Sequence, residues 1–231
     1  MTNLISTLKD KNRLSIVTLF ALALFICVSL VGLRVHYTEK ATFVFLVWNI
    51  FLALIPYAIS TIMVLTHETI RNRWLLILPF TAWLCFFPNA PYILTDLFHL
   101  KERPGVPFWY DLALILFFAW SGLMLGYASL MDMQMIITRH FSRLAGWVAV
   151  IGSLVLGSFG IYLGRYLRWN SWDVVSSPLA LVEDIVTRLA DPASHPRTYG
   201  VTIVFSVFLI VGYLTLTQFS RAYSNKTVPK G

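Results

Sequence analysis

Charged residues are scarce in this sequence. Only 13% of its 231 residues are charged, whereas an ordinary soluble domain carries about 25%. This shortage argues against a water-soluble enzyme, and a hydrophobic content of 58% argues against a disordered protein. Cysteine is scarce too: Cys27 and Cys85 show no disulfide or metal-ligand spacing and are interpreted as small core residues.

Six apolar segments contain no charged residue and are long enough to cross a bilayer. A hydrocarbon core about 30 Å thick requires roughly 20 helical residues. All the charges lie between these segments, which a soluble helical core would not produce. We therefore predict an all-α integral membrane bundle of about six transmembrane helices, forming one domain over 1–231. The predicted spans are 14–33, 41–65, 74–94, 112–131, 144–164 and 199–219.

The third predicted span is interrupted by proline. It contains Pro79 near its start and the run Pro88-Asn89-Ala90-Pro91 near its end. Proline has no backbone N–H, so the carbonyls of Leu84 and Phe87 lose their helical donors. Inside a membrane, such groups must find other partners. The segment either spans with a kink, or stops at Phe87 and restarts as a short separate helix.

The basic residues predict how the chain is oriented. Six spans place both termini on one side, and an excess of Lys and Arg marks the cytoplasmic side. With cytoplasmic termini, the inner segments carry the whole net charge of +7, and the outer segments are neutral. Attraction to anionic lipids explains these charges, and no nucleic-acid-binding motif is present. The inner basic residues are Lys9, Lys11, Arg13, Arg71, Arg73, Arg139, Arg143, Arg221, Lys226 and Lys230.

Polar residues gather just after the proline run, on the predicted outer side. Tyr92, Thr95, Asp96 and His99 are spaced i, i+3, i+4 and i+7, which places them on one face of an α-helix. Asp96 and His99 would suit a general acid/base pair, a proton relay or two metal ligands. Two ligands alone do not make a metal site. Alternatively, the pair bonds to itself and caps freed backbone groups.

A second polar group follows the fifth span. Arg165 and Arg168 are expected to lie one turn apart, flanked by Tyr166, Trp169 and Trp172. Such aromatic residues form an interfacial belt, with arginines reaching to the headgroups beside them. The alternative is an arginine pair that binds a phosphate or carboxylate.

A short amphipathic helix is predicted in the long outer loop, over 178–190. Ser177 and Pro178 suit its N-cap and first position, and Asp184 can pair with Arg188 at i, i+4. Too short to span, the helix should lie along the membrane surface, either as a lid or as a simple connection. Its apolar side consists of Leu179, Val182, Ile185, Val186 and Leu189.

Gly122 and Gly126 form a small-xxx-small pair in the fourth span. Because lipid supplies no hydrophobic drive for helices to associate, such small residues are used to bring backbones close together. We therefore predict that these glycines serve packing.

Two stretches resemble a known family. They are Pro88-Asn89-Ala90-Pro91-Tyr92 with Thr95, Asp96 and His99-Leu100, and Gly164-Arg165 with Leu167 to Asp173. In these motifs the chain resembles the domain-of-unknown-function family 1361, a bacterial family of small multi-pass membrane proteins, from the second span to the sixth. The resemblance implies a protein of the bacterial cytoplasmic membrane and supplies no catalytic roles.

Three functions fit these patterns. The first is an enzyme or enzyme-like protein acting on a lipid-linked or anionic substrate at the outer leaflet. Asp96 and His99 would move a proton, and Asn89 or Tyr92 would orient the substrate. The negative group would be held by Arg165, Arg168 and Arg197.

The second function is a proton-coupled carrier or channel-like protein built around the broken third span. Against it, no ionisable residue lies within any predicted span. The third is a scaffold subunit that binds a membrane-protein partner. The sequence assigns no cofactor and no metal site, names no partner besides membrane lipids, and leaves the oligomeric state open.

Overall fold

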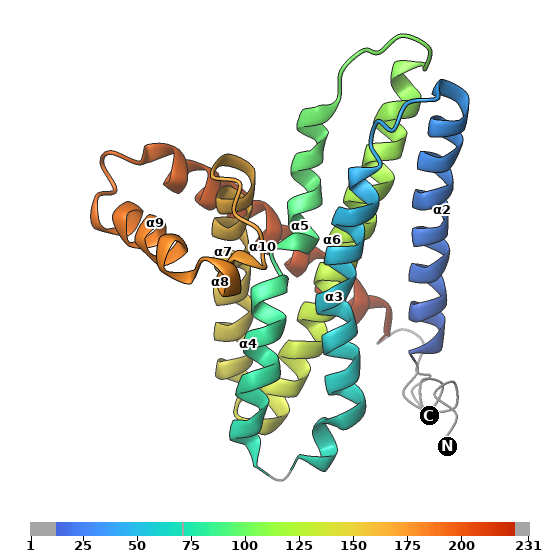
Figure 1. Ribbon diagram of the computed structural model, residues 1–231. Coiled ribbons are helices and arrows are strands. Elements are labelled where there is room, and N and C mark those ends of the chain that lie inside the picture. The colour runs from blue at the N-terminus through green and yellow to red at the C-terminus, as the bar shows by residue number, and fades with distance from the viewer. Residues whose placement is uncertain (1–12, 71, 225–231) are drawn as a thin grey trace. The chain divides into compact units, whose positions relative to one another are not determined.

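The computed structural model describes residues 13–70 and 72–224, which form helices and connecting loops without any strand. Residue contacts divide the chain into two compact units, Met1–Val150 and Ile151–Gly231, so the single domain stays a prediction. Figure 1 labels the helices along the chain. Several basic residues used to predict orientation lie outside the described residues: Lys9, Lys11, Arg71, Lys226 and Lys230.

Six helical segments are long and apolar enough to cross a membrane, which confirms the predicted all-α membrane fold. Five are continuous helices, and the third is a composite segment over Arg73–His99. The continuous helices are α2 (Leu14–Thr38), α3 (Phe45–Thr66), α6 (Phe108–His140), α7 (Arg143–Tyr166) and α10 (Pro196–Ser224).

Two of these helices extend beyond the predicted spans and include charged residues. Helix α2 continues through Arg34 to Thr38, and α6 includes Asp111 and Asp132. The helices are thus longer than the predicted spans 14–33 and 112–131, whose ends fall beside these charged residues. The charges do not stop the helices because they pair across them: Arg34 with Asp111, and Arg13, the residue before α2, with Asp132.

These two ion pairs set the register of α2 against α6. The helices run antiparallel, since Arg13 meets Asp132 and Arg34 meets Asp111. In each helix, the two charged positions lie 21 residues apart, which at 1.5 Å per residue is about 31 Å. That length matches a hydrocarbon core of about 30 Å. The spacing of the two ion pairs along the helices therefore equals the thickness expected between the two boundaries of a hydrocarbon core.

The third membrane segment is broken rather than kinked. It consists of η2 (Arg73–Leu76), α4 (Ile77–Phe86), α5 (Asn89–Tyr92) and η3 (Ile93–His99), and α4 ends just before Pro88. The freed backbone is satisfied locally. The Phe87 carbonyl accepts from the Ala90 N–H at 3.1 Å, and Asn89 Nδ2 donates to the Phe86 carbonyl at 2.9 Å.

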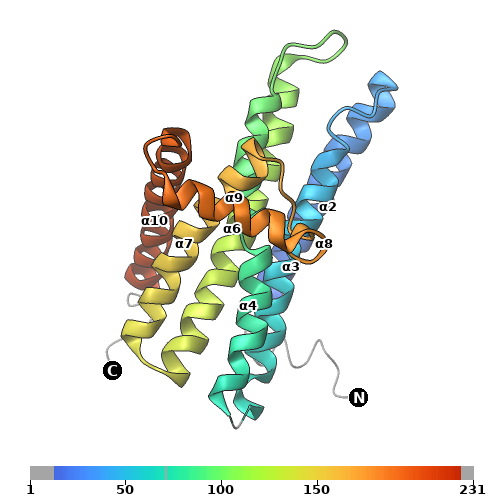
Figure 2. The same cartoon turned by 60° about the vertical axis from the view of Figure 1, so that its left-hand side comes forward.

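The break packs directly against the glycines of α6. A Cβ on Gly122 would lie 2.7 Å from Ile93 Cδ1 and 2.9 Å from the Ala90 carbonyl oxygen, and one on Gly126 would lie 3.0 Å from Ala90 Cβ. The approach at Gly122 requires glycine, the one at Gly126 leaves little room for a larger residue, and both agree with the predicted packing role. Gly122 lies about halfway along α6 between Asp111 and Asp132, so the break sits near mid-depth. Helix α3 runs alongside α6, and α4 packs against α3 (Figure 2).

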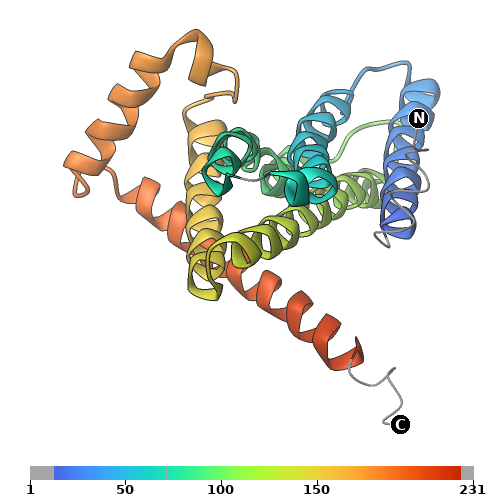
Figure 3. The same ribbon diagram turned by 90° about the horizontal axis from the view of Figure 1, so that it is seen from below.

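The second unit holds the end of α7, the short helix α8 (Asp173–Ser176), α9 (Pro178–Ala190) and α10. Helix α9 has the predicted bounds and begins with Pro178, but Ser177 makes no side-chain capping bond. Figure 3 shows α9 extending sideways from the end of α7 rather than continuing along it.

Candidate functional site

The residues after the proline break lie on a 3-10 helix, not on an α-helix. Residues three apart are aligned in such a helix, so Asp96 lines up with His99 while Thr95 lines up with Tyr92. Thr95 Oγ1 donates to the Tyr92 carbonyl at 2.7 Å. The predicted common face for all four residues is therefore wrong, although its two ionisable members do lie together.

Asp96 and His99 form a close pair that differs sharply in exposure. His99 Nδ1 lies 3.8 Å from Asp96 Oδ1, and the side chains are 42% and 1% exposed respectively. Asn49 Nδ2, from α3, donates to Asp96 Oδ2 at 2.8 Å, and the His99 ring packs on Phe45 at 5.0 Å between centroids. The result is a buried carboxylate that holds one side of a half-exposed imidazole.

The depth of Asp96 follows from its partner on α3. Asn49 lies eleven residues from Ser60, whose Oγ donates to Asp132 at the other membrane boundary. Eleven residues rise about 16 Å, roughly half the distance between the two ion pairs. Along α3, Asp96 therefore lies at a level between the two ion pairs, although its position is outside the predicted third span of 74–94.

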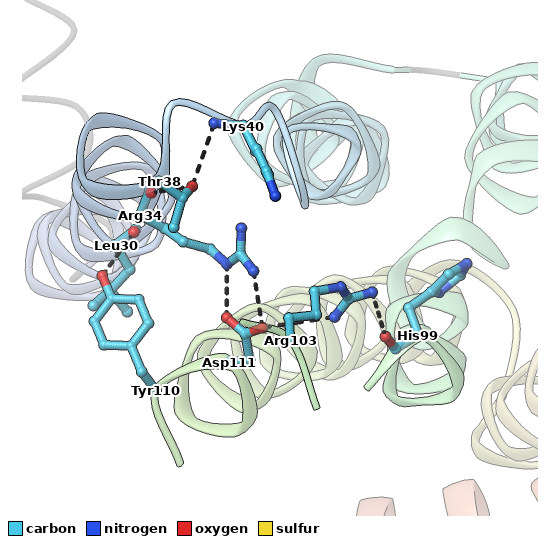
Figure 4. Close-up of polar contacts among 8 residues, drawn as sticks. All are labelled: Leu30, Arg34, Thr38, Lys40, His99, Arg103, Tyr110 and Asp111. Atoms are coloured by element: carbon cyan, nitrogen blue, oxygen red, sulfur yellow. Dashed lines mark hydrogen bonds and ion pairs between the residues drawn. The ribbon is translucent and has the colours of Figure 1, made fainter. Parts of the chain in front are cut away.

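A second polar cluster lies at the same end of the first unit, around Asp111 (Figure 4). Arg34 donates to both its carboxylate oxygens, from Nε to Oδ1 at 2.7 Å and from Nη2 to Oδ2 at 3.0 Å. Arg103, from the loop before α6, places its Nη1 3.6 Å from Asp111 Oδ2. Two guanidinium groups thus share one carboxylate whose side chain is 2% exposed.

Arg103 joins this cluster to His99. Its Nη2 donates to the His99 carbonyl at 3.0 Å, as Figure 4 shows. The Phe43 ring lies within 4.9 Å of the Arg34 guanidinium carbon and 4.6 Å of that of Arg103. Asp111, Arg103, His99 and Asp96 therefore form a continuous polar chain from the membrane boundary inward.

Sequence reasoning missed Arg34, Asn49, Arg103 and Asp111. Arg34 directly follows one apolar run and Asp111 directly precedes another, so opposite charges at span ends were an available signal. Asn49 is a single amide within an apolar run, and its position in the sequence gave no signal of a role in the site.

The opposite end of the first unit carries a bidentate ion pair, although the Arg13 Nε is buried without a hydrogen-bond partner. Arg13 Nη1 and Nη2 donate to the two Asp132 oxygens at 2.6 and 2.7 Å, and Nη2 also reaches Thr61 Oγ1 at 3.1 Å. Ser60 Oγ donates to Asp132 Oδ2 at 2.8 Å. With these hydrogen bonds around it, the Asp132 carboxylate serves to hold α2, α3 and α6 together.

In the second unit, the structure separates the two predicted anion-binding arginines. Arg165 belongs to the last turn of α7, whereas Arg168 lies beyond the helix end with φ 63°. The expectation that they lie one helical turn apart is therefore wrong, because α7 ends at Tyr166 between them. Arg197 places its guanidinium carbon 5.7 Å from the centre of the Tyr166 ring.

Helix α9 is held by its polar side. Trp169 Nε1 donates to Asp184 Oδ2 at 2.7 Å, Arg188 Nη1 donates to Asp184 Oδ1 at 3.0 Å, and Tyr199 Oη donates to the Arg188 carbonyl at 2.9 Å. The Trp169 hydrogen bond, with that from Arg188, lowers the pKa of Asp184. The apolar side of α9 is left exposed: Leu179 is 84% exposed and Val182 55%.

The predicted site residues fall into two groups. Asn89, Tyr92, Asp96 and His99 belong to the first unit, whereas Arg165, Arg168 and Arg197 belong to the second. That the groups converge stays a prediction. Among the residues that the structure describes, no group of three or more His, Cys, Asp or Glu side chains could hold a metal ion.

The helices and their buried polar groups define a multi-pass α-helical membrane protein. Residues 48–211 match the family described as "Protein of unknown function (DUF1361)". The match covers more than half of the chain, which therefore belongs to this family, as its resemblance predicted. No curated protein and no solved structure matches the chain.

Proposed function

We propose that this protein binds, and acts on, a lipid-linked or anionic substrate at the outer face of the bacterial cytoplasmic membrane. The observation that carries the proposal is the Asp96–His99 pair, in which a buried carboxylate lies 3.8 Å from a half-exposed imidazole. Ionisable groups at membrane depth are costly and are generally retained for function. Both termini would lie in the cytoplasm, opposite the pair.

The pair is suited to proton transfer. His99 Nδ1 faces Asp96, which leaves Nε2 as the ring nitrogen that can exchange a proton with a substrate. When the ring takes up a proton, the Asp96 carboxylate stabilises the imidazolium, and Asn49 keeps the carboxylate in place through its hydrogen bond. His99 would act as the general acid or base, and Asp96 would position and stabilise it.

The remaining predicted residues have supporting roles in this proposal. Asn89 and Tyr92 border the proline break and would orient the substrate. Arg165, Arg168 and Arg197 carry positive charge at the predicted outer ends of α7 and α10, where they would attract anionic headgroups.

The pH dependence of binding tests the proposal. Purified protein in phosphatidylglycerol nanodiscs is titrated with a fluorescent anionic lipid between pH 5 and 8. We expect His99→Gln to flatten the pH dependence of binding, and Asp96→Asn to alter it. His36→Gln is the matched control, because His36 is an exposed histidine at the end of α2. A wild-type titration curve in His99→Gln would overturn the proposed role.

A proton-coupled carrier is a second candidate, favoured by one observation. The proline break packs against Gly122, near mid-depth, where discontinuous helices of carriers place their sites. Proteoliposomes loaded with a pH-sensitive dye separate the two candidates. Proton movement driven by an anion gradient, and lost in Asp96→Asn, would favour the carrier; pH-dependent binding without flux would favour the first proposal. A scaffold role would require a partner that co-purifies in fixed ratio.

A further inference from the structure

The cluster around Asp111 carries more positive than negative charge. Arg34 and Arg103 both lie within ion-pair distance of this single carboxylate. Asp96, the next carboxylate along the polar chain, is engaged by Asn49 and His99. The cluster therefore retains one net positive charge at the membrane boundary.

Unused hydrogen-bond donors accompany this charge. The Nη1 atoms of Arg34 and Arg103 are buried and have no hydrogen-bond partner, and the whole Arg34 residue is only 3% exposed. A buried charged donor without a hydrogen-bond partner is costly. The Arg103 Nη1 faces Asp111 Oδ2 at 3.6 Å, beyond hydrogen-bond distance, so both Nη1 atoms keep donor capacity for a further negatively charged partner.

From this geometry we propose that Arg34 and Arg103 bind a phosphoryl group, and so hold the negative group of the substrate. This inference rests on the proposed function and names the ligand chemistry of the same outer site. Guanidinium groups match the spacing of phosphate oxygens with paired hydrogen bonds. The depth fits as well, because the Arg34–Asp111 pair marks the boundary where lipid phosphates lie.

Arg103 is the residue through which the ligand enters. Its side chain is 27% exposed, whereas those of Arg34 and Asp111 are 2% exposed. Arg103 Nη2 also donates to the His99 carbonyl, so a phosphoryl group bound to Arg103 lies beside the residue that would move the proton. Asp111 positions both guanidinium groups and does not contact the ligand.

The test compares Arg103→Gln with Lys101→Gln. Both variants remove one positive charge from the same loop, but Lys101 is exposed and is not part of the Asp111 cluster. Binding is measured with nanodiscs of phosphatidylglycerol against phosphatidylcholine doped with the same fluorescent lipid, and separately with inorganic phosphate. We expect Arg103→Gln to weaken binding by about tenfold or more, the equivalent of one charge-assisted hydrogen bond. Lys101→Gln should change it by less than about twofold.

The probes distinguish the source of the phosphoryl group. Saturable binding of inorganic phosphate that is lost in Arg103→Gln would indicate a soluble phosphate compound, whereas Arg103-dependent binding of the fluorescent lipid without binding of inorganic phosphate would indicate a lipid headgroup. An equal loss of binding in Arg103→Gln and Lys101→Gln would show that only surface charge matters, and would overturn the inference. Unchanged affinity in Arg103→Gln would overturn it as well. Thermal unfolding of each variant confirms that it is folded.

Failure of this inference and failure of the proposed function give different results. If Arg103→Gln binds normally while His99→Gln still loses its pH dependence, the proton-transfer pair stands and the phosphoryl group is held elsewhere. If His99→Gln titrates as wild type while Arg103→Gln binds weakly, the site binds phosphoryl groups without proton transfer.

Discussion

Charged residues are tolerated near this membrane core because they form ion pairs with residues of other helices. The Arg13 and Asp132 side chains are 9% and 13% exposed, whereas the paired Arg139 and Glu68 are 59% and 47% exposed. Water screens the Arg139–Glu68 pair, which therefore contributes little to the free energy of unfolding. The buried pair behaves differently, because removing one partner leaves an uncompensated charge in a region of low dielectric constant.

We therefore predict unequal costs for the same kind of substitution. Asp132→Ala should lower the free energy of unfolding by about 3–5 kcal/mol, since it strands the Arg13 guanidinium. Glu68→Ala should lower it by less than about 1 kcal/mol. Unfolding in mixed micelles of increasing dodecyl sulfate fraction measures both. Equal effects of the two substitutions would show that burial does not govern these ion pairs.

Among the helical elements, the broken third segment depends on glycine in its neighbour. The Ala90 carbonyl and the Ile93 side chain both lie where a Gly122 Cβ would stand. Because a backbone atom is one of the two obstacles, a side-chain rotation alone cannot make room. The segment that carries Asp96 and His99 would have to move away from α6.

Gly122→Ala should accordingly destabilise the first unit by about 1–3 kcal/mol, the usual cost of overpacking. It should also weaken any pH-dependent binding that uses His99. Gly32→Ala is the matched control, because a Cβ on Gly32 of α2 meets nothing within 4 Å; there the higher helix propensity of alanine should leave stability unchanged or slightly raised. Unfolding in mixed micelles tests this prediction, which would be wrong if the two variants behaved alike.

The same elements show how far sequence reasoning reaches. Long uncharged runs identified all six membrane segments, and the proline run located the break, because both signals are local. The continuation of α2 and α6 beyond the predicted spans was not visible in the sequence, because Arg34 is tolerated through its ion pair with Asp111, 77 positions away in the chain. The 3-10 geometry of η3 was missed for a similar reason. Its close packing on α6 decides the backbone there, so Asp96 aligns with His99 and not with Thr95.

For the molecule as a whole, the charges carry two kinds of information. The paired residues set depth, with Arg13–Asp132 at one boundary of the first unit and Arg34–Asp111 at the other. The net charge of +7 predicts orientation. On this prediction, the Arg13 end faces the cytoplasm and the Asp111 cluster faces outward. The proposed substrate site therefore needs the orientation to be correct as well as the local geometry.

Cysteine labelling in intact cells tests that orientation. In a background with Cys27 and Cys85 replaced by alanine, single cysteines are placed at three exposed positions, as Lys101→Cys, Asn170→Cys and Arg143→Cys. A membrane-impermeant maleimide should label Lys101→Cys and Asn170→Cys in cells with a permeabilised outer envelope, because these positions follow odd-numbered spans. It should label Arg143→Cys only after lysis, because Arg143 follows an even-numbered span. The reverse pattern would place the Asp96–His99 pair, Arg34 and Arg103 on the cytoplasmic side. It would therefore refute a function at the outer face. Different labelling of Lys101→Cys and Asn170→Cys would mean that α6 and α7, the two helices between these positions, do not both cross the membrane.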